Sequence, residues 1–158
     1  DLYLGASTWP NVVDGGDVIR YDYAANTFET VYQVYEQGIR IIKVLNDKLY
    51  IPGTDSMGSW RWGNIYIFDG NNWVKKETVP WAAHVWNIDS INDELYVTAW
   101  TVENYGLNET TIYRSADDGD TWEKVEGFNN NTNLAKWTDN FNPASGTPDG
   151  PVTHSIRI

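Results

Sequence analysis

A turn and the strand that follows it are predicted by Asn46-Asp47-Lys48-Leu49-Tyr50-Ile51, and this stretch decides the fold because it returns later in the chain. The second copy is Asn92-Asp93-Glu94-Leu95-Tyr96-Val97, and Leu2-Tyr3-Leu4 is a third, shorter copy. The Tyr residues of the three copies are 47 and 46 positions apart. Asn and Asp favour tight turns, and alternating apolar residues favour strands. The sequence therefore contains an internal repeat.

Two further markers keep the same order and nearly the same spacing. One is rich in β-branched and aromatic residues, and its copies are Val18-Ile19-Arg20-Tyr21, Asn64-Ile65-Tyr66-Ile67 and Thr111-Ile112-Tyr113-Arg114. The other is an aromatic residue with polar neighbours, and its copies are Phe28-Glu29-Thr30, Trp73-Val74-Lys75 and Trp122-Glu123-Lys124. Such segments are typical of strands, and the Gly, Asn and Asp between them are typical of turns. Each unit is predicted to hold four antiparallel strands, which in the second unit are 39–44, 49–53, 64–68 and 73–77.

A repeat of this length with four antiparallel strands is the pattern of a β-propeller blade. The sequence therefore predicts an all-β fold with about three blades, in units 1–36, 37–82 and 83–127. Residues 128–158 are predicted to be a long loop followed by the first strand of a further blade, because Thr153–Ile158 resembles 37–41. Propellers have roughly four to eight blades. We expect these three to belong to a larger ring, either in a longer chain or in a six-bladed dimer whose copies exchange their last strands.

One turn carries a complete motif. The stretch Ser115-Ala116-Asp117-Asp118-Gly119-Asp120-Thr121-Trp122 fits the pattern Ser-x-Asp-x-Gly-x-Thr-Trp at every fixed position. On these residues the chain resembles the Asp-box (BNR) repeat propellers, which include sialidases, xyloglucan-active glycoside hydrolases and sorting receptors. The other units keep reduced forms, Tyr21-Asp22 to Phe28 and Phe68-Asp69 to Trp73, and Gly15-Gly16-Asp17 is similar to kelch repeats.

The resemblance implies a structural turn away from the ligand face. Its expected structural residues are Ser115, Asp117, Gly119, Thr121 and Trp122. The carboxylate of Asp117 suits acceptance of backbone N–H bonds, and Gly119 suits a positive φ. Trp122 suits burial between neighbouring sheets.

Aromatic residues gather in the loops predicted to open on one face, which are those between second and third strands and those between blades. Six of the nine Trp residues fall in or beside these loops. Rings with polar edges suit stacking on sugar rings. The predicted ligand-binding residues are Trp9, Trp60, Arg61, Trp62, Trp81, His84, Trp100 and Tyr105. The alternative is that these rings pack between long loops.

Catalytic and metal-binding residues are not assigned. A sialidase needs a Tyr nucleophile paired with Glu and an acid/base Asp, and the characteristic Arg-Ile-Pro opening is absent. Arg40 and Arg157 occupy equivalent repeat positions, which favours a repeated structural role. Candidate carboxylates lie in loops, at Asp14, Asp17, Asp55 and Glu103. His84 and His154 belong to different units, so neither metal nor cofactor is predicted.

Charge and composition restrict the partners. The chain has 158 residues, 22 acidic and 11 basic, with a net charge of −11. This balance argues against binding to nucleic acid or to an anionic membrane surface. No apolar run reaches the ~20 residues of a membrane span. The chain has no Cys, which excludes disulfides, and the sequons at Asn108 and Asn130 are compatible with secretion.

Three functional hypotheses follow. The first is an extracellular or cell-surface binding module that recognises a glycan or a protein through the aromatic loop face. The second is a fragment of an Asp-box glycoside hydrolase, sialidase-like or xyloglucanase-like. The third is a purely structural or assembly propeller. We favour the first, because the sequence defines no acid/base pair, and we expect a homo-oligomer or further blades of a longer chain as partner.

Overall fold

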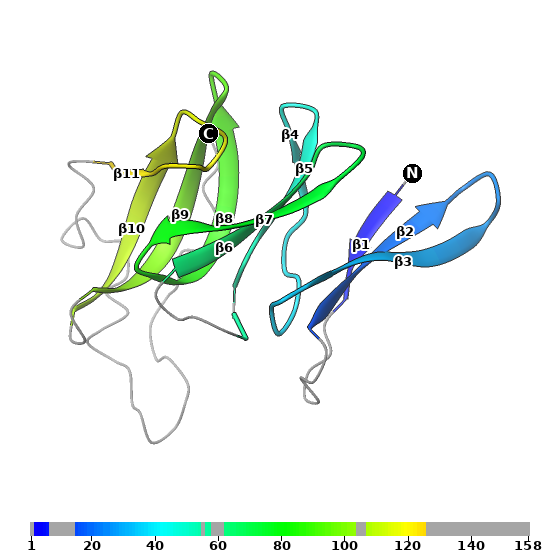
Figure 1. The fold of residues 1–158 in the computed structure, drawn as a ribbon, viewed down its shortest axis with the longest axis horizontal. Coiled ribbons are helices and arrows are strands. Elements are labelled where there is room, and N and C mark those ends of the chain that lie inside the picture. Colours follow the sequence, from blue (N-terminus) through cyan, green and yellow to red (C-terminus); the bar gives the residue numbers. More distant parts are fainter. Residues whose placement is uncertain (1, 7–14, 55, 58–61, 104–106, 126–158) are drawn as a thin grey trace.

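The computed structural model describes residues 2–6, 15–54, 56–57, 62–103 and 107–125 (Figure 1). These residues form eleven strands and no helix. The strands make three antiparallel sheets that lie side by side, in chain order from right to left in Figure 1. The predicted all-β fold class, with blade-like sheets of consecutive strands, is confirmed, whereas the larger ring stays a prediction.

Within each sheet the strands follow one another as in the sequence. The first sheet contains β1 (Leu2–Gly5), β2 (Gly16–Asp22) and β3 (Thr27–Val34). The second contains β4 (Lys43–Leu45), β5 (Lys48–Pro52), β6 (Trp62–Phe68) and β7 (Trp73–Pro80). The third contains β8 (Ala82–Ile91), β9 (Glu94–Glu103), β10 (Leu107–Ser115) and β11 (Glu123–Lys124). The last predicted strand, Thr153–Ile158, lies outside the described residues.

The first strand of the second unit is shorter than predicted. Strand β4 begins at Lys43, and residues 39–42 form no strand. Ile39 and Ile42 instead pack against the apolar cluster between the first two sheets. The apolar residues in 39–42 are therefore explained by side-chain burial and not by strand pairing.

The Asn-Asp pairs of the repeat form the predicted hairpin turns. Asn46 and Asp47 have φ angles of 49° and 62°, and Asn92 and Asp93 have φ angles of 50° and 68°. Two successive left-handed residues match the type I′ turn, whose twist fits the strands on either side. Asn and Asp are, after Gly, the residues that best tolerate this conformation.

Strand register corrects the sequence alignment of the second marker. Tyr3, Tyr50 and Tyr96 pair with Arg20, Ile67 and Arg114 respectively. These three partners are therefore equivalent, so the first copy of the marker is displaced by one residue from the other two. A shift of one residue moves a side chain to the opposite face of a sheet. Ile19 accordingly lies on the partly exposed face of its sheet, whereas Ile65 is fully buried.

Two apolar clusters hold the sheets together. One joins the first and second sheets and includes Val18, Val34, Ile51 and Tyr66. The other joins the second and third sheets, and its buried members are Tyr50, Ile65, Ile67, Val79, Ala82, Val85, Ile88, Leu95, Val97, Ala99 and Tyr113. Successive residues of β5 and β6 alternate between the two clusters, as the strand period requires. The second sheet is therefore covered on both faces.

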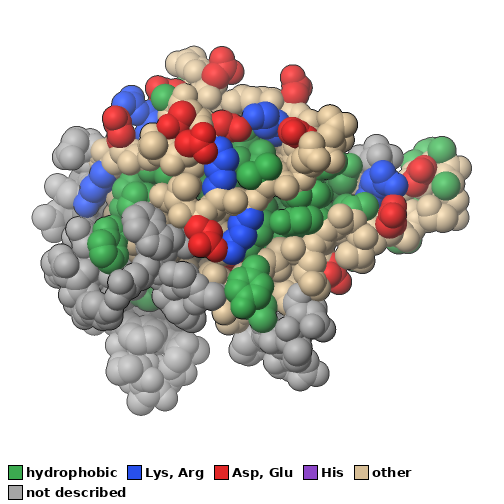
Figure 2. All heavy atoms as spheres, viewed as in Figure 1, with side chains coloured by type: hydrophobic (Ala, Val, Ile, Leu, Met, Phe, Trp, Pro, Cys, Tyr) green, Lys and Arg blue, Asp and Glu red, His purple; other side chains and the backbone are tan. Residues whose placement is uncertain are grey.

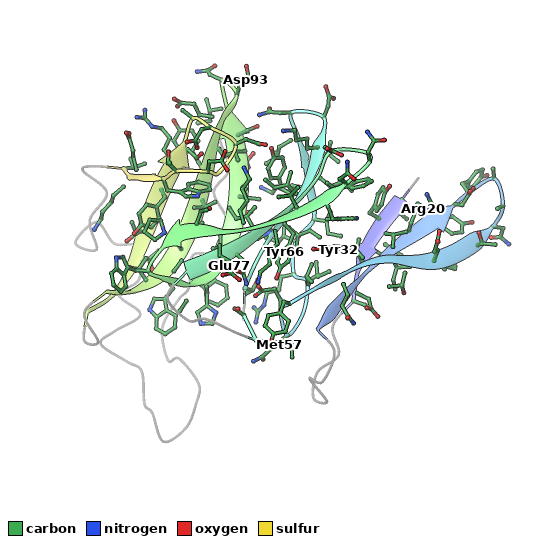
Figure 3. The ribbon with its side chains drawn as sticks, in the orientation of Figure 1. Arg20, Tyr32, Met57, Tyr66, Glu77 and Asp93 are labelled. Carbon is green, nitrogen blue, oxygen red and sulfur yellow. The ribbon has the colours of Figure 1, made fainter. Side chains whose placement is uncertain are left out.

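The tight turns and the longer connections lie at opposite ends of the sheets. Figure 3 shows Asp93, in the β8–β9 turn, at the upper end and Met57, between β5 and β6, at the lower end. We name the end that holds Met57 the loop end and the other the turn end. The connection between β3 and β4 also runs at the loop end (Figure 1).

Candidate functional site

The turn formed by Ser115–Trp122 is closed by hydrogen bonds among its own residues. Asp117 Oδ1 accepts from the backbone N–H of Thr121 and from the Ser115 hydroxyl, both at 2.8 Å. Asp117 Oδ2 accepts from the Thr121 hydroxyl at 2.5 Å. Bonds from Thr121, together with that from Ser115, lower the pKa of Asp117 to about 2. Gly119 donates its N–H to Ser115 Oγ at 2.8 Å and has a φ of +85°, which only Gly adopts without cost.

The same turn is fixed to the second sheet. Thr78, on β7, links the two because its hydroxyl donates to the Gly119 carbonyl at 2.6 Å and accepts from Trp122 Nε1 at 3.1 Å. Lys76 donates to the Asp118 carbonyl at 2.8 Å. Tyr50, on β5, donates to the Asp118 carboxylate. These contacts join the Ser115–Trp122 turn of the third sheet to β5 and β7 of the second sheet.

Half of the predicted ligand-binding residues lie outside the described residues. These are Trp9, Trp60, Arg61 and Tyr105. Trp62 begins β6 and pairs with Pro80 through its backbone. The side chains of Trp81, His84 and Trp100 are described. The candidate carboxylates Asp14 and Asp55 also lie outside the described residues, and Asp17 accepts a hydrogen bond from Gln33 at 3.3 Å.

Two of these residues take part in a column of stacked groups that starts at Arg40. The Arg40 guanidinium lies over the Trp86 ring, 5.4 Å from its centroid. The His84 ring lies 4.8 Å from Trp86 on one side and 4.9 Å from Trp100 on the other, with interplanar angles of 19° and 18°. His84 and Trp86 are buried, Trp100 is half-buried and Arg40 is exposed. The two ends of the column are therefore the parts available to a ligand.

His84 lies in the middle of this column. Both faces of its ring are covered by Trp rings, and its Nδ1 contacts the Thr54 carbonyl oxygen. The hydroxyls of Thr54 and Thr98 are buried and have no hydrogen-bond partner in the described part of the chain. His84 therefore supports the column and the Thr54 backbone and does not itself present a ring to solvent.

A buried polar cluster beside the column was not predicted from the sequence. Its centre is Glu36, which is fully buried in the connection between β3 and β4. The Glu36 carboxylate accepts from Asn64 Nδ2 and from the Tyr66 hydroxyl, the latter at 3.1 Å. Asn64 also donates to Ser56 Oγ at 3.1 Å, and the Tyr66 hydroxyl accepts from the Tyr35 backbone N–H at 2.9 Å. The cluster joins the connection between β3 and β4 to the loop between β5 and β6.

The Tyr66–Glu36 pair does not have the properties of a catalytic nucleophile and its base. Tyr66 is 1% exposed. Burial, followed by the charge of Glu36, raises the pKa of the Tyr66 phenol. An activated nucleophile needs access to substrate and a base that promotes its ionisation. The phenol instead stays protonated and donates a structural hydrogen bond.

Backbone contacts fix the base of the same loop. Gly53 donates its N–H to the Asn64 carbonyl and accepts from the Val85 N–H, both at 2.8 Å. A Cβ at Gly53 would lie 2.7 Å from Glu36 Oε1 and 2.9 Å from Asn64, which explains the Gly. Met57 donates its N–H to the Tyr35 carbonyl at 3.2 Å. The start of the loop is therefore held by three different segments of the chain.

A scan against protein-family models and a search of curated proteins both find no match for this chain. In the described ranges, the acidic and His side chains form no group of three or more suited to a metal ion. The same ranges contain no helix with the length and hydrophobicity of a membrane span.

Proposed function

We propose that this chain is a binding module that recognises a glycan or a protein at the loop end of its sheets. The observation that carries the proposal is the column of Arg40, Trp86, His84 and Trp100, whose ends reach the surface beside a rigid loop base. Preorganised aromatic groups bind with little loss of conformational entropy. The fully buried Glu36 cluster supports this rigidity.

A glycan is the ligand that the column suits best. A sugar offers an apolar C–H face that stacks on an indole ring, and its hydroxyls accept hydrogen bonds from a guanidinium group. Trp100 and Arg40 supply one group of each kind at the two ends of the column. Trp81, which follows β7 with a left-handed φ of 57°, is also half-buried at this end. A protein ligand with exposed carboxylates is the alternative partner.

The proposal includes the wider class of protein. We propose an Asp-box propeller, supported by the closed Ser115–Trp122 turn and by the three blade-like sheets. The sequons at Asn108 and Asn130 support an extracellular location. Neither proposal assigns a catalytic residue.

A glycan array and a glycosidase assay on the intact chain test the binding proposal. We expect selective glycan binding without turnover, and loss of that binding in Trp100→Ala and Arg40→Ala. Truncation of an aromatic or Arg anchor weakens binding by about 1–3 kcal/mol. Val44→Ala is the control, since Val44 is 70% exposed next to the Asn46 turn. Turnover of a glycoside, or equal binding by all variants, would refute the proposal.

A further inference from the structure

The second and third sheets each place a Trp residue against the sheet before them. Trp73, at the start of β7, stacks on Tyr32 of β3, with a centroid distance of 4.6 Å and an interplanar angle of 9°. Trp122, just before β11, donates to Thr78 of β7. Trp73 begins the fourth strand of its unit, and Trp122 immediately precedes the fourth strand of the next unit. A Trp residue at equivalent positions therefore contacts the preceding sheet twice, by stacking between the second and first sheets and by a hydrogen bond between the third and second.

The second-strand Tyr residues receive the turn of the following sheet. Tyr3, on β1, lies 6.1 Å from Phe68, at the end of β6. Tyr50, on β5, donates to Asp118, which follows β10. Each sheet thus has a receiving face, marked by its second-strand Tyr, and an inserting face, marked by its fourth-strand aromatic residue.

The inserting face of the first sheet is exposed. Phe28, equivalent to Trp73 and Trp122, is 67% exposed, and its ring centroid lies 4.7 Å from that of Tyr21 in the same hairpin, at an interplanar angle of 31°. Leu2 pairs with Tyr21, and Tyr21 pairs with Phe28, so these side chains share one face. Leu2, Leu4 and Tyr23 are 54%, 40% and 85% exposed. Figure 2 shows hydrophobic side chains gathered at the tip of the β2–β3 hairpin, on the right.

The receiving face of the third sheet repeats the chemistry of the first. Arg20 and Glu29 form an ion pair at 2.7 Å beside Tyr3, and the equivalent residues Arg114 and Glu123 form one at 2.8 Å beside Tyr96. A cavity of about 310 Å³ opens here, and its described lining is Tyr96, Arg114, Glu123, Lys124 and Val125. Val125 donates its backbone N–H to the Ile112 carbonyl. It therefore occupies the position in the third sheet that Lys76, the partner of Ile65, occupies in the second.

We propose that a second copy of this chain places its third sheet against the inserting face of the first sheet, so that copies associate head to tail. The two faces already meet twice within one chain, and each copy presents one of each. An interface between different faces is heterologous, so it forms a ring where the rotation closes and a filament where it does not. Phe28 of one copy then occupies, on the other copy's third sheet, the place that Trp73 occupies on the first sheet.

Cysteine cross-linking of the full chain tests the orientation, because the natural sequence has no Cys. Two single-Cys variants are prepared, Tyr23→Cys on the inserting face and Val125→Cys on the receiving face, and treated with a short thiol-reactive cross-linker. We expect a covalent dimer when the two variants are mixed and little when either is treated alone. A mixture of Val44→Cys with Val125→Cys is the control. Cross-linking of Tyr23→Cys to itself would overturn the head-to-tail arrangement.

Sedimentation over a range of concentrations tests the association itself. We expect species of at least twice the mass of one chain, and association weaker by on the order of tenfold in Phe28→Ser, in line with loss of one interface anchor. Val44→Ser should associate like the unmodified chain. A monomer at every concentration would overturn the proposal. Neither measurement contains a glycan, so a failure of association and a failure of glycan binding are seen separately.

Discussion

Asp118 and Lys48 are 70 residues apart in the chain, and their side chains form an ion pair of 2.7 Å between Oδ2 and Nζ. This pair joins the Ser115–Trp122 turn of the third sheet to the start of β5 in the second. Burial raises the pKa of Asp118, but bonds from Lys48 and Tyr50 outweigh it, so the pKa lies below its usual value of 3.8.

This lowered pKa predicts a loss of stability in acid. A carboxylate with a lower pKa in the folded state stabilises the fold above its unfolded pKa, and the stabilisation is lost as the pH falls through the folded pKa. We expect the free energy of unfolding to fall below about pH 4, and to fall less steeply in Asp118→Asn. Asn tolerates the left-handed φ of 59° at this position. Denaturant titrations between pH 2 and 7 measure the slope, and equal slopes would contradict the assignment.

The hydrogen bond between Trp122 and Thr78 predicts energetic coupling between the Ser115–Trp122 turn and the second sheet. Trp122→Phe keeps a ring but removes the Nε1 donor, and Thr78→Val removes its acceptor. Each change should cost about 1 kcal/mol of unfolding free energy. The double variant should cost less than the sum of the two, which a double-mutant cycle by urea unfolding measures. Additive losses would show that the bond contributes nothing.

The contrast between core and loop-end Trp residues separates packing from ligand contact. Trp73→Ala removes a ring stacked on Tyr32 and on Phe68, and should destabilise the fold by roughly 3 kcal/mol. Trp81→Ala removes a half-buried ring in a left-handed turn residue and should cost less stability. Thermal unfolding measures both. Equal destabilisation would assign Trp81 to packing.

The buried Glu36 predicts a specific weakness at the loop end. Asn64 and Tyr66 both donate to Glu36 Oε1, and Glu36→Gln keeps this oxygen but removes its negative charge. Hydrogen bonds to an ionised group are roughly twice as strong as neutral ones, so we expect a cost of about 1–2 kcal/mol. We expect faster hydrogen exchange at the amide of Met57, which bonds to Tyr35 next to Glu36. Glu77→Gln is the matched control, because the Glu77 side chain is half exposed at 51%. Unchanged exchange in Glu36→Gln would contradict a supporting role.

The type I′ turn at Asn46-Asp47 predicts opposite effects of two substitutions. Asp47→Gly suits the φ of 62° and should leave stability unchanged or slightly higher. Asp47→Val places a β-branched residue in the left-handed region, which costs about 1–2 kcal/mol. Urea unfolding of the two variants compares them directly, and equal stabilities would reject the assigned turn type.

Sequence reasoning predicted the sheets because their signals are local. Tight turns at Asn46 and Asn92 and alternating residues after them report backbone geometry within a few positions. The register of the first sheet could be assigned only from strand pairing. Arg20 and Tyr66 occupy the same position in the sequence motif, but their side chains point to opposite faces of their sheets. The stretch 39–42 alternates like a strand although it packs as a connection.

The candidate site was predicted only in part, because its contacts join distant residues. Aromatic residues at loop positions pointed to Trp100 and His84, but no local pattern shows that Trp86 and Trp100 enclose the His84 ring. Glu36 gave no signal at all: its partners Asn64 and Tyr66 are 28 and 30 residues away. From the sequence alone, a charged residue next to Tyr35 would be assigned to the surface. In the structure it is buried beside the loop between β5 and β6.

The second sheet is the only one of the three that is covered on both faces by described residues, and this sets an order of events for unfolding. Tyr50 and Ile65 face one neighbour while Ile51 and Tyr66 face the other. Neither group is exposed to solvent until the first or the third sheet separates from the second. Local unfolding should therefore start at these two outer sheets. In stacked repeats, stability is shared between neighbours and local opening spreads inward from the terminal units. The amides of β5 and β6 should therefore be the slowest to exchange, and the chain's kinetic lifetime should depend on how firmly its outermost sheets are held.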